Sequence, residues 1–171
     1  MKRAIVISLL LALLTGCAAP QTADVFTVDD ELLPEVQPTF RIVFAVPTDA
    51  VLSVSSDDGL QSCYTAEDGR YTIQTSIRPG VRAEQAMQDM TGFTADELSP
   101  IRTRRMGMAQ YRFSWCSGED GGVLICTGAV LESEDACYCL SFMTPENCSR
   151  ACRELQMQVM DSFSLFEDEG F

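Results

Sequence analysis

The C-terminal half of the chain constrains the fold most, because apolar and polar side chains alternate along three successive segments of residues 101–143. We expect strands over 101–116, 123–131 and 136–143, joined by the short polar segments SGEDGG and ESED. Connections this short are typical of consecutive antiparallel strands. The sequence therefore predicts an antiparallel meander in this half of the chain.

A helix is expected before the meander, over residues 82–90, where apolar residues recur at helical spacing. Gly92 follows at the position where a C-terminal cap favours glycine. Thr94 with Glu97 is typical of a capping box, which predicts one further helical turn. This helix would be inserted between strands.

A second helix is expected from Pro145 to about Phe163. Thr144 is the predicted N-cap, with proline at the first helical position and an acidic residue in the first turn. The stripe predicted to face inward consists of Cys148, Cys152, Leu155, Val159 and Phe163. Together these elements indicate an α+β fold, an antiparallel sheet with an inserted helix and a C-terminal helix packed on it.

The N-terminal part of the domain adds strands to this sheet. Residues 40–47 are β-branched and aromatic, and Pro47 ends the run. Residues 60–66 and 71–77 are predicted to form a hairpin, because Asp68-Gly69 supplies the positive-φ position of a tight turn.

Four regions are expected along the chain: a signal peptide over 1–16, a lipidated N-terminus with a flexible acidic tether over 17–38, a single α+β domain over 39–166, and an acidic tail over 167–171. The tether prediction rests on its acidic residues, its prolines and its lack of a sustained apolar period. The alternative is that residues 26–33 dock on the domain.

The first residues have the layout of a secretory signal, with Lys2 and Arg3 before an apolar run that is too short to span a membrane. The run ends in Leu14-Thr15-Gly16-Cys17, which resembles the lipobox of bacterial lipoproteins. This resemblance implies cleavage before Cys17 and lipidation of its thiol, including palmitate, so that acyl chains hold the protein on the extracytoplasmic face of the cell membrane.

The charge and composition of the mature chain exclude several classes of function. Without residues 1–16 the chain has ten arginines against 25 acidic residues, and it has neither lysine nor histidine. A nucleic-acid partner is not expected, because phosphate binding requires a cationic surface. Histidine-based catalysis, histidine-containing zinc sites and lysine Schiff bases are impossible, and we expect no cofactor and no enzymatic activity.

Eight cysteines are the most unusual part of the composition. Strand alternation places Cys137 and Cys139 on one sheet face, and with ESED as the turn Cys126 shares that face, opposite Ser141. If the last helix covers the same face, Cys148 and Cys152 project onto it. Five thiols would then lie in one layer.

Three interpretations of this layer stay open. The thiols are either packed as small apolar groups, or joined as structural disulfides, or used for redox chemistry or metal binding. The third interpretation would use Cys137, Cys139, Cys148 and Cys152, and Cys148 is its strongest redox candidate because it lies near a helix N-terminus.

The order of elements also resembles the PsbP-like α/β/α sandwich, which is named for a photosystem II extrinsic protein and occurs in small bacterial lipoproteins. The similarity covers roughly residues 40–166 and rests on four segments: MTG at 90–92, QYRFSW at 110–115, YCLSF at 138–142 and VMDSFSL at 159–165. The resemblance implies a non-enzymatic binding or accessory module, and it carries over no functional residue.

One basic cluster remains, in which Arg102 and Arg104 share a strand face. They are either a solvated face or a contact for an acidic partner, such as a protein, or for an acidic ligand. The sequence thus predicts a lipid-anchored extracytoplasmic binding or accessory module, and the alternative is a thiol redox or metal-handling protein.

Overall fold

The computed structural model describes residues 40–119 and 122–167. The expected signal peptide, Cys17 and the expected tether lie outside the described residues. Within these ranges no helix is both long and apolar enough to cross a membrane. The elements in chain order are β1 Phe40–Val43, β2 Ala50–Ser55, β3 Gln61–Ala66, β4 Thr72–Pro79, α2 Ala83–Thr91, α3 Ala95–Leu98, β5 Ile101–Arg105, β6 Met108–Glu119, β7 Gly122–Glu132, β8 Ala136–Pro145, the 3₁₀ turn η1 Glu146–Cys148, α4 Ser149–Ser162 and β9 Ser164–Glu167.

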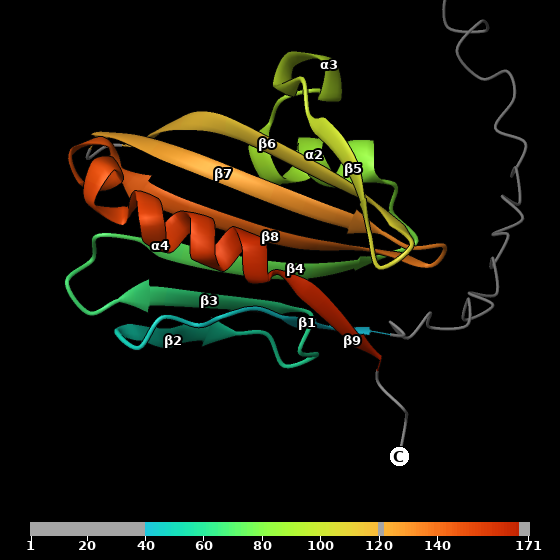
Figure 1. Cartoon of the computed structure of the whole chain (residues 1–171), viewed down its shortest axis with the longest axis horizontal. Coiled ribbons are helices and arrows are strands. Elements are labelled where there is room, and N and C mark those ends of the chain that lie inside the picture. Colours follow the sequence, from blue (N-terminus) through green and yellow to red (C-terminus); the bar gives the residue numbers. More distant parts are fainter. Residues whose placement is uncertain (1–39, 120–121, 168–171) are drawn as a thin grey trace, which may run out of the picture. The chain divides into compact units, whose positions relative to one another are not determined.

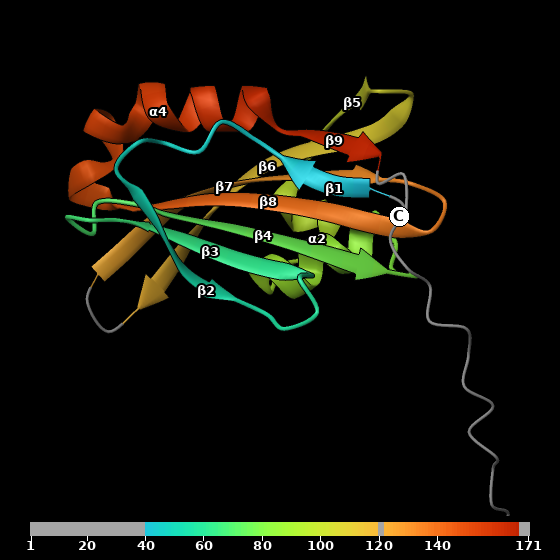
Figure 2. The same ribbon diagram turned by 90° about the horizontal axis from the view of Figure 1, so that it is seen from below.

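Seven strands form one antiparallel sheet in the order β2-β3-β4-β8-β7-β6-β5 (Figure 1). Strands β1 and β9 pair with each other in a separate antiparallel ribbon. Figure 2 shows α4 and this ribbon on one side of the sheet and α2 on the other. We call these sides the α4 face and the α2 face. The predicted antiparallel sheet with an inserted helix and a C-terminal helix packed on it is confirmed.

The α4 face carries the larger hydrophobic core. Tyr138, Leu140 and Phe142 alternate onto this face of β8 and pack with Val159 and Phe163 of α4 and its C-terminal cap, and all five are fully buried. Burying each such side chain stabilises the fold by about 1.5–3 kcal/mol. The predicted inward stripe of the C-terminal helix is therefore confirmed.

The α2 face carries a smaller core beneath a shorter helix. Ala86 and Met87 of α2 pack on Val130, Cys137 and Cys139, and none of these side chains is more than 1% exposed. Small side chains on both sides allow the helix to lie close to the sheet. The predicted cap at Gly92 is confirmed, since this residue ends α2 at a φ of 79°.

The capping box of the next turn is also confirmed, with Thr94 and Glu97 bonded reciprocally at the start of α3. The predicted start of the last helix is wrong. Strand β8 continues through Thr144 to Pro145, and α4 begins only at Ser149 after η1. The Thr144 hydroxyl is buried and donates a hydrogen bond to the Arg70 carbonyl at 2.9 Å, so it is not available as an N-cap.

Two strand predictions also change, and two strands are added. The segment expected as one strand from 101 to 116 is the hairpin β5–β6, which turns at Met106 and Gly107 with φ values of 54° and 81°. Both values lie in the left-handed region that two-residue hairpin turns require. Strand β1 ends at Val43, earlier than predicted, and strands β2 and β9 were not predicted.

The register between β7 and β8 differs from the expected one by two residues. Glu132 pairs with Cys137, and Cys126 lies opposite Met143 rather than Ser141. The Ser133 hydroxyl accepts the Ala136 N–H at 3.0 Å and thereby tightens the turn. A shift by two residues keeps every side chain on its predicted face.

Candidate functional site

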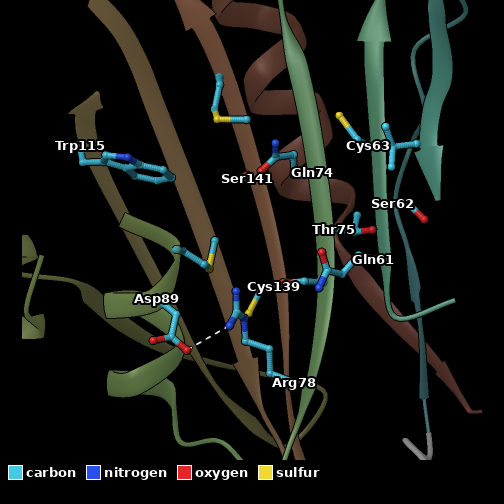
Figure 3. A pocket seen from close by; sticks show the side chains of 14 residues that line it. Gln61, Ser62, Cys63, Gln74, Thr75, Arg78, Asp89, Trp115, Cys139 and Ser141 are labelled. Atoms are coloured by element: carbon cyan, nitrogen blue, oxygen red, sulfur yellow. Dashed lines mark hydrogen bonds and ion pairs between the residues drawn. The ribbon is translucent and has the colours of Figure 1, made fainter. Parts of the chain in front are cut away.

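A hollow of about 380 Å³ lies on the α2 face, on the half of the sheet that α2 leaves uncovered (Figure 3). We call it the α2-face groove. Strands β3, β4 and β8 form its floor, α2 borders one side, and Val54 of the edge strand β2 borders the other. The side chains used below are Gln61, Cys63, Gln74, Arg78, Asp89, Trp115, Cys139 and Ser141.

The register of the sheet explains why the floor is polar. Cys63, Gln74 and Ser141 lie side by side across β3, β4 and β8. The neighbouring row consists of Gln61, Ser76 and Cys139. Alternation gives the same strands an apolar row on the α4 face, so each strand faces the core on one side and the groove on the other.

Ser141 is the most informative side chain of the floor, because it is only 4% exposed. A side chain this little exposed nearly always has a hydrogen-bond partner, from protein, water or ligand. No other residue in the described ranges hydrogen-bonds to the Ser141 hydroxyl, which opens onto the groove. The side-chain amides of Gln61 and Gln74 are exposed and likewise have no hydrogen-bond partner among the described residues. The groove therefore offers donors and acceptors that the described fold does not use.

An ion pair lies where the groove meets α2. Arg78 on β4 donates to the Asp89 carboxylate at 3.0 Å, as Figure 3 shows. These two are the only charged side chains among the described residues that line the groove. Because they neutralise each other, the groove favours a ligand without net charge. The Nε atom of Arg78 is buried and has no described hydrogen-bond partner.

Trp115 forms the wall on the β6 side, and Gly128 allows it to lie there. A Cβ atom on Gly128 would be 2.7 Å from the Phe113 ring and 3.1 Å from the Trp115 ring. The two rings thus lie across the bare backbone of β7, with centroids 5.6 Å apart. Trp115 is half-buried, and Figure 3 shows it pointing from β6 toward the groove.

The five predicted thiols do not form a single layer, so that prediction is wrong. Cys137 and Cys139 lie on the α2 face against α2, whereas Cys148 and Cys152 lie on the α4 face beneath α4. Cys126 is buried on the α2 face, four positions from Cys139 in the register. The sheet separates the two pairs because α4 covers the aromatic row of β8 rather than the cysteine row.

The thiols of Cys137 and Cys139 behave as small buried groups. Burial raises the pKa of Cys137 to about 12 and that of Cys139 to about 11, so both are protonated at neutral pH. The Cys137 thiol donates to the Val81 carbonyl at 3.0 Å. No disulfide joins Cys137, Cys139, Cys148 or Cys152. Among the residues described, no three Cys, Asp or Glu side chains converge as metal ligands. This geometry favours packing over the redox or metal interpretation.

The basic cluster lies far from the groove, on the opposite edge of the sheet. Arg102 and Arg104 project from β5 on the α2 face, and both are exposed. The Arg102 guanidinium lies 5.6 Å from the centroid of the Tyr111 ring. The candidate partner contact and the groove are therefore two separate surfaces.

Sequence reasoning missed the groove residues Gln61, Gln74 and Ser141. The available signal was polar side chains at alternate positions of strands whose other face is apolar. A strand face that lines a groove and a strand face that is simply solvated have the same polar pattern in the sequence. Only the position of α2 in the structure distinguishes the groove from a solvated surface.

Comparison with known proteins rests on structure alone. No protein family and no curated protein matches the sequence. A protein of Bacteroides thetaiotaomicron VPI-5482 matches with a TM-score of 0.51 and 10% identity over 75% of this chain, which spans 46% of that protein. LpqN, involved in cell envelope biogenesis of Mycobacterium tuberculosis, matches with a TM-score of 0.49 and 13% identity over 74% of this chain and 83% of LpqN.

Cyanobacterial PsbP (CyanoP) from Synechocystis sp. PCC 6803 matches with a TM-score of 0.51 and 10% identity, over 75% of this chain and 93% of CyanoP. At this identity the likeness concerns the fold and not the function. The two-sided covering of the antiparallel sheet and this match agree with the resemblance stated from the sequence, and the domain has a PsbP-like fold.

Proposed function

We propose that the protein is a lipid-anchored extracytoplasmic accessory protein, without enzymatic activity, that binds a small neutral ligand in the α2-face groove. Three features support this proposal. The lipobox-like segment ends at Cys17, the mature chain lacks histidine and lysine, and the PsbP-like domain has a polar hollow on its less covered face.

The ligand proposal rests mainly on the Ser141 hydroxyl. It lies in the floor of a hollow of about 380 Å³, a size that suits a small molecule. The residue is only 4% exposed, and no described residue hydrogen-bonds to its hydroxyl. The amides of Gln61 and Gln74 can each donate and accept. A ligand rich in hydroxyl or amide groups would therefore satisfy this floor, and the half-buried Trp115 would contact its less polar side.

The single tryptophan of the chain provides the assay, because it lies in the wall of the groove. Neutral small molecules extracted from the cell envelope would be fractionated and added to the protein while Trp115 emission is recorded. We expect a saturable change with an active fraction, lost in Ser141→Leu, which fills the floor. The control Ser55→Leu changes an exposed serine on the α4 face and should bind normally. A response that survives Ser141→Leu would contradict the proposed site.

Lipid anchoring is tested separately at Cys17. Cells fed with labelled palmitate should label the wild-type protein and not the Cys17→Ala variant, because only the cysteine thiol accepts the acyl group. The variant should also leave the membrane fraction. Labelling of Cys17→Ala, or its full retention in membranes, would refute this part of the proposal.

The exposed pair Arg102 and Arg104 is proposed as a contact for an acidic protein surface. The support is that neither guanidinium forms an ion pair with a carboxylate in the part of the chain that the structure describes. Unpaired surface arginines cost little to bring to a partner, since no existing pair has to be broken.

A further inference from the structure

The two edges of the seven-stranded sheet differ in chemistry. Strand β2, at one edge, has the sequence AVLSVS and therefore carries no charge. Its Val51, Leu52 and Val54 side chains are 52%, 51% and 62% exposed. Edge strands of soluble proteins are usually protected by charged side chains, proline or bulges. Here the protection is a single bulge between Leu52 and Val54, so β2 is an apolar and largely open edge.

Strand β5, at the other edge, is basic. Its five residues, IRTRR, include Arg102, Arg104 and Arg105, and the first of its residues, Ile101, is 69% exposed. Apart from the contact of Arg102 with the Tyr111 ring, the three arginines have no charged partner among the described residues. No strand in the described ranges pairs with the outer side of β5 or of β2.

Carboxylates surround β2 at both ends. They are Asp49, Glu67 and Asp68 at its start and Asp57 and Asp58 in the turn that follows it. The Glu67 N–H donates to the Asp49 carbonyl at 3.2 Å, which places the first group together. Among the residues that the structure describes, Arg70 is the one cation that pairs with these carboxylates, through Asp49 and Asp68. The surroundings of β2 therefore stay strongly acidic.

We propose that β5 of one copy of the protein pairs with β2 of a second copy and extends the sheet from chain to chain. Strands β2 and β5 run in the same direction in the sheet, so a second copy added in the same orientation pairs β5 parallel to β2 and keeps the two α2 faces on one side. Arg102 and Arg104 then lie on the same side as Val51 and Val54, next to the carboxylates at the ends of β2. Ile101 lies on the other side, with Leu52. Two β2 edges would oppose carboxylates, and two β5 edges would oppose arginines, so the mixed pair is the complementary one.

This contact is heterologous, so each added copy leaves one free β2 edge and one free β5 edge. It rests on the partner contact proposed above for Arg102 and Arg104, and it identifies that partner as a second copy. A single strand pair buries less surface than a stable dimer interface, so the association should be weak in solution. Anchoring of all copies in one membrane would raise their local concentration and favour it.

The experiment uses two reciprocal variants of the full chain, both with Cys17→Ser to prevent acylation. Variant A carries Val51→Lys and Val54→Lys on β2, and variant B carries Arg102→Glu and Arg104→Glu on β5. Sedimentation would be measured from about 10 µM to about 1 mM, where weak contacts become populated. The parent chain should exceed its monomer mass of 18.8 kDa increasingly as the concentration rises.

Each variant alone should remain monomeric. In variant A the new lysines on β2 repel the arginines on β5 of the next copy, and in variant B the new glutamates on β5 repel the carboxylates around β2. An equimolar mixture should recover association, because the glutamates on β5 of variant B attract the lysines on β2 of variant A. The control Arg150→Glu with Arg153→Glu makes the same charge change on exposed positions of α4 and should associate like the parent. Thermal unfolding of all chains shows whether each is folded.

Three results would overturn the proposal: a parent chain that stays monomeric throughout, variants that associate alone as the parent does, or a mixture of folded A and B that stays monomeric. None of these results bears on ligand binding, because the ligand assay follows Trp115 in the parent chain and does not use variant A, whose Val54→Lys change lies at the border of the groove. Failure of the ligand assay would equally leave the edge contact untouched.

Discussion

Replacing Gly128 with alanine tests whether the Phe113 and Trp115 rings pack against the bare backbone at this position. The added Cβ would be 2.7 Å from two atoms of the Phe113 ring, closer than carbon atoms approach without displacement. Phe113 is 5% exposed and cannot simply swing into solvent. The ring must therefore move against its neighbours, and Trp115, 3.1 Å from the same Cβ, must move with it.

The size of the effect follows from two opposing contributions. Forcing an extra carbon into a packed site costs about 1–3 kcal/mol. Alanine also restricts the unfolded chain and thereby returns about 0.4–1 kcal/mol. Gly118→Ala on β6 is a matched control, because a Cβ there meets no atom within 4 Å and its backbone is equally permissive for alanine. The entropic gain cancels between the two variants, so Gly128→Ala should be less stable than Gly118→Ala by about 1–3 kcal/mol.

Urea unfolding followed by Trp115 fluorescence and by far-ultraviolet circular dichroism measures this difference. We expect Gly128→Ala to unfold at lower urea concentration with an altered native emission spectrum, and Gly118→Ala to keep the wild-type spectrum. Equal stability of the two variants with unchanged emission would show that the rings do not rest on Gly128. The proposed wall of the groove would then be misplaced.

Three further predictions concern titration and reactivity. Burial raises the pKa values of Cys137 and Cys139, so these thiols ionise at lower pH in the unfolded chain than in the folded one. The free energy of unfolding should therefore fall as pH rises from 9 to about 11, by about 1.4 kcal/mol per pH unit for each thiol. Urea unfolding of the wild type and of the chain with both cysteines changed to alanine checks this, because the variant should lack the fall. The Tyr71 hydroxyl, 2.6 Å from Asp49, lowers the pKa of that carboxyl, and the stability this bond gives is present above the unfolded value of 3.8 and lost as pH falls. Tyr71→Phe should therefore be less stable than the wild type at neutral pH, and the difference should shrink as pH falls below 3.8, as urea unfolding across this range would show. Of the described thiols, exposed Cys116 should react first with an alkylating reagent, as peptide mass spectrometry would show.

Local features of the fold were predictable because local residues determine them. The Asp68-Gly69 turn, the cap at Gly92 and the capping box of Thr94 each depend on a few adjacent residues, and the structure has all three. The start of the last helix was not predictable in this way. Thr144 and Pro145 suit an N-cap, but the buried bond from Thr144 to a carbonyl on a distant turn holds them in β8.

The covering of the sheet could not be predicted from alternation, because alternation defines two faces and does not assign the helices to them. On β8 the two faces are Tyr138, Leu140 and Phe142 against Cys137 and Cys139. The longer helix covers the row with more apolar surface, since burying large side chains yields more free energy than burying thiols. The expected meeting of strand and helix thiols failed for this reason.

The same difference in cover explains why the α2-face groove exists where it does. Helix α2 has nine residues and is about 14 Å long, whereas α4 has 14 residues and is about 21 Å long. On the α4 face, the β1–β9 ribbon also packs over the half of the sheet that α4 does not reach. On the α2 face nothing in the described ranges takes that place. Where α2 covers the sheet, the side chains are Val130, Cys137 and Cys139; where it does not, they change to Gln74 and Ser141. The change of side chains along one sheet face therefore follows the end of one short helix, and it places a polar binding surface beside an apolar core without any change in the strands.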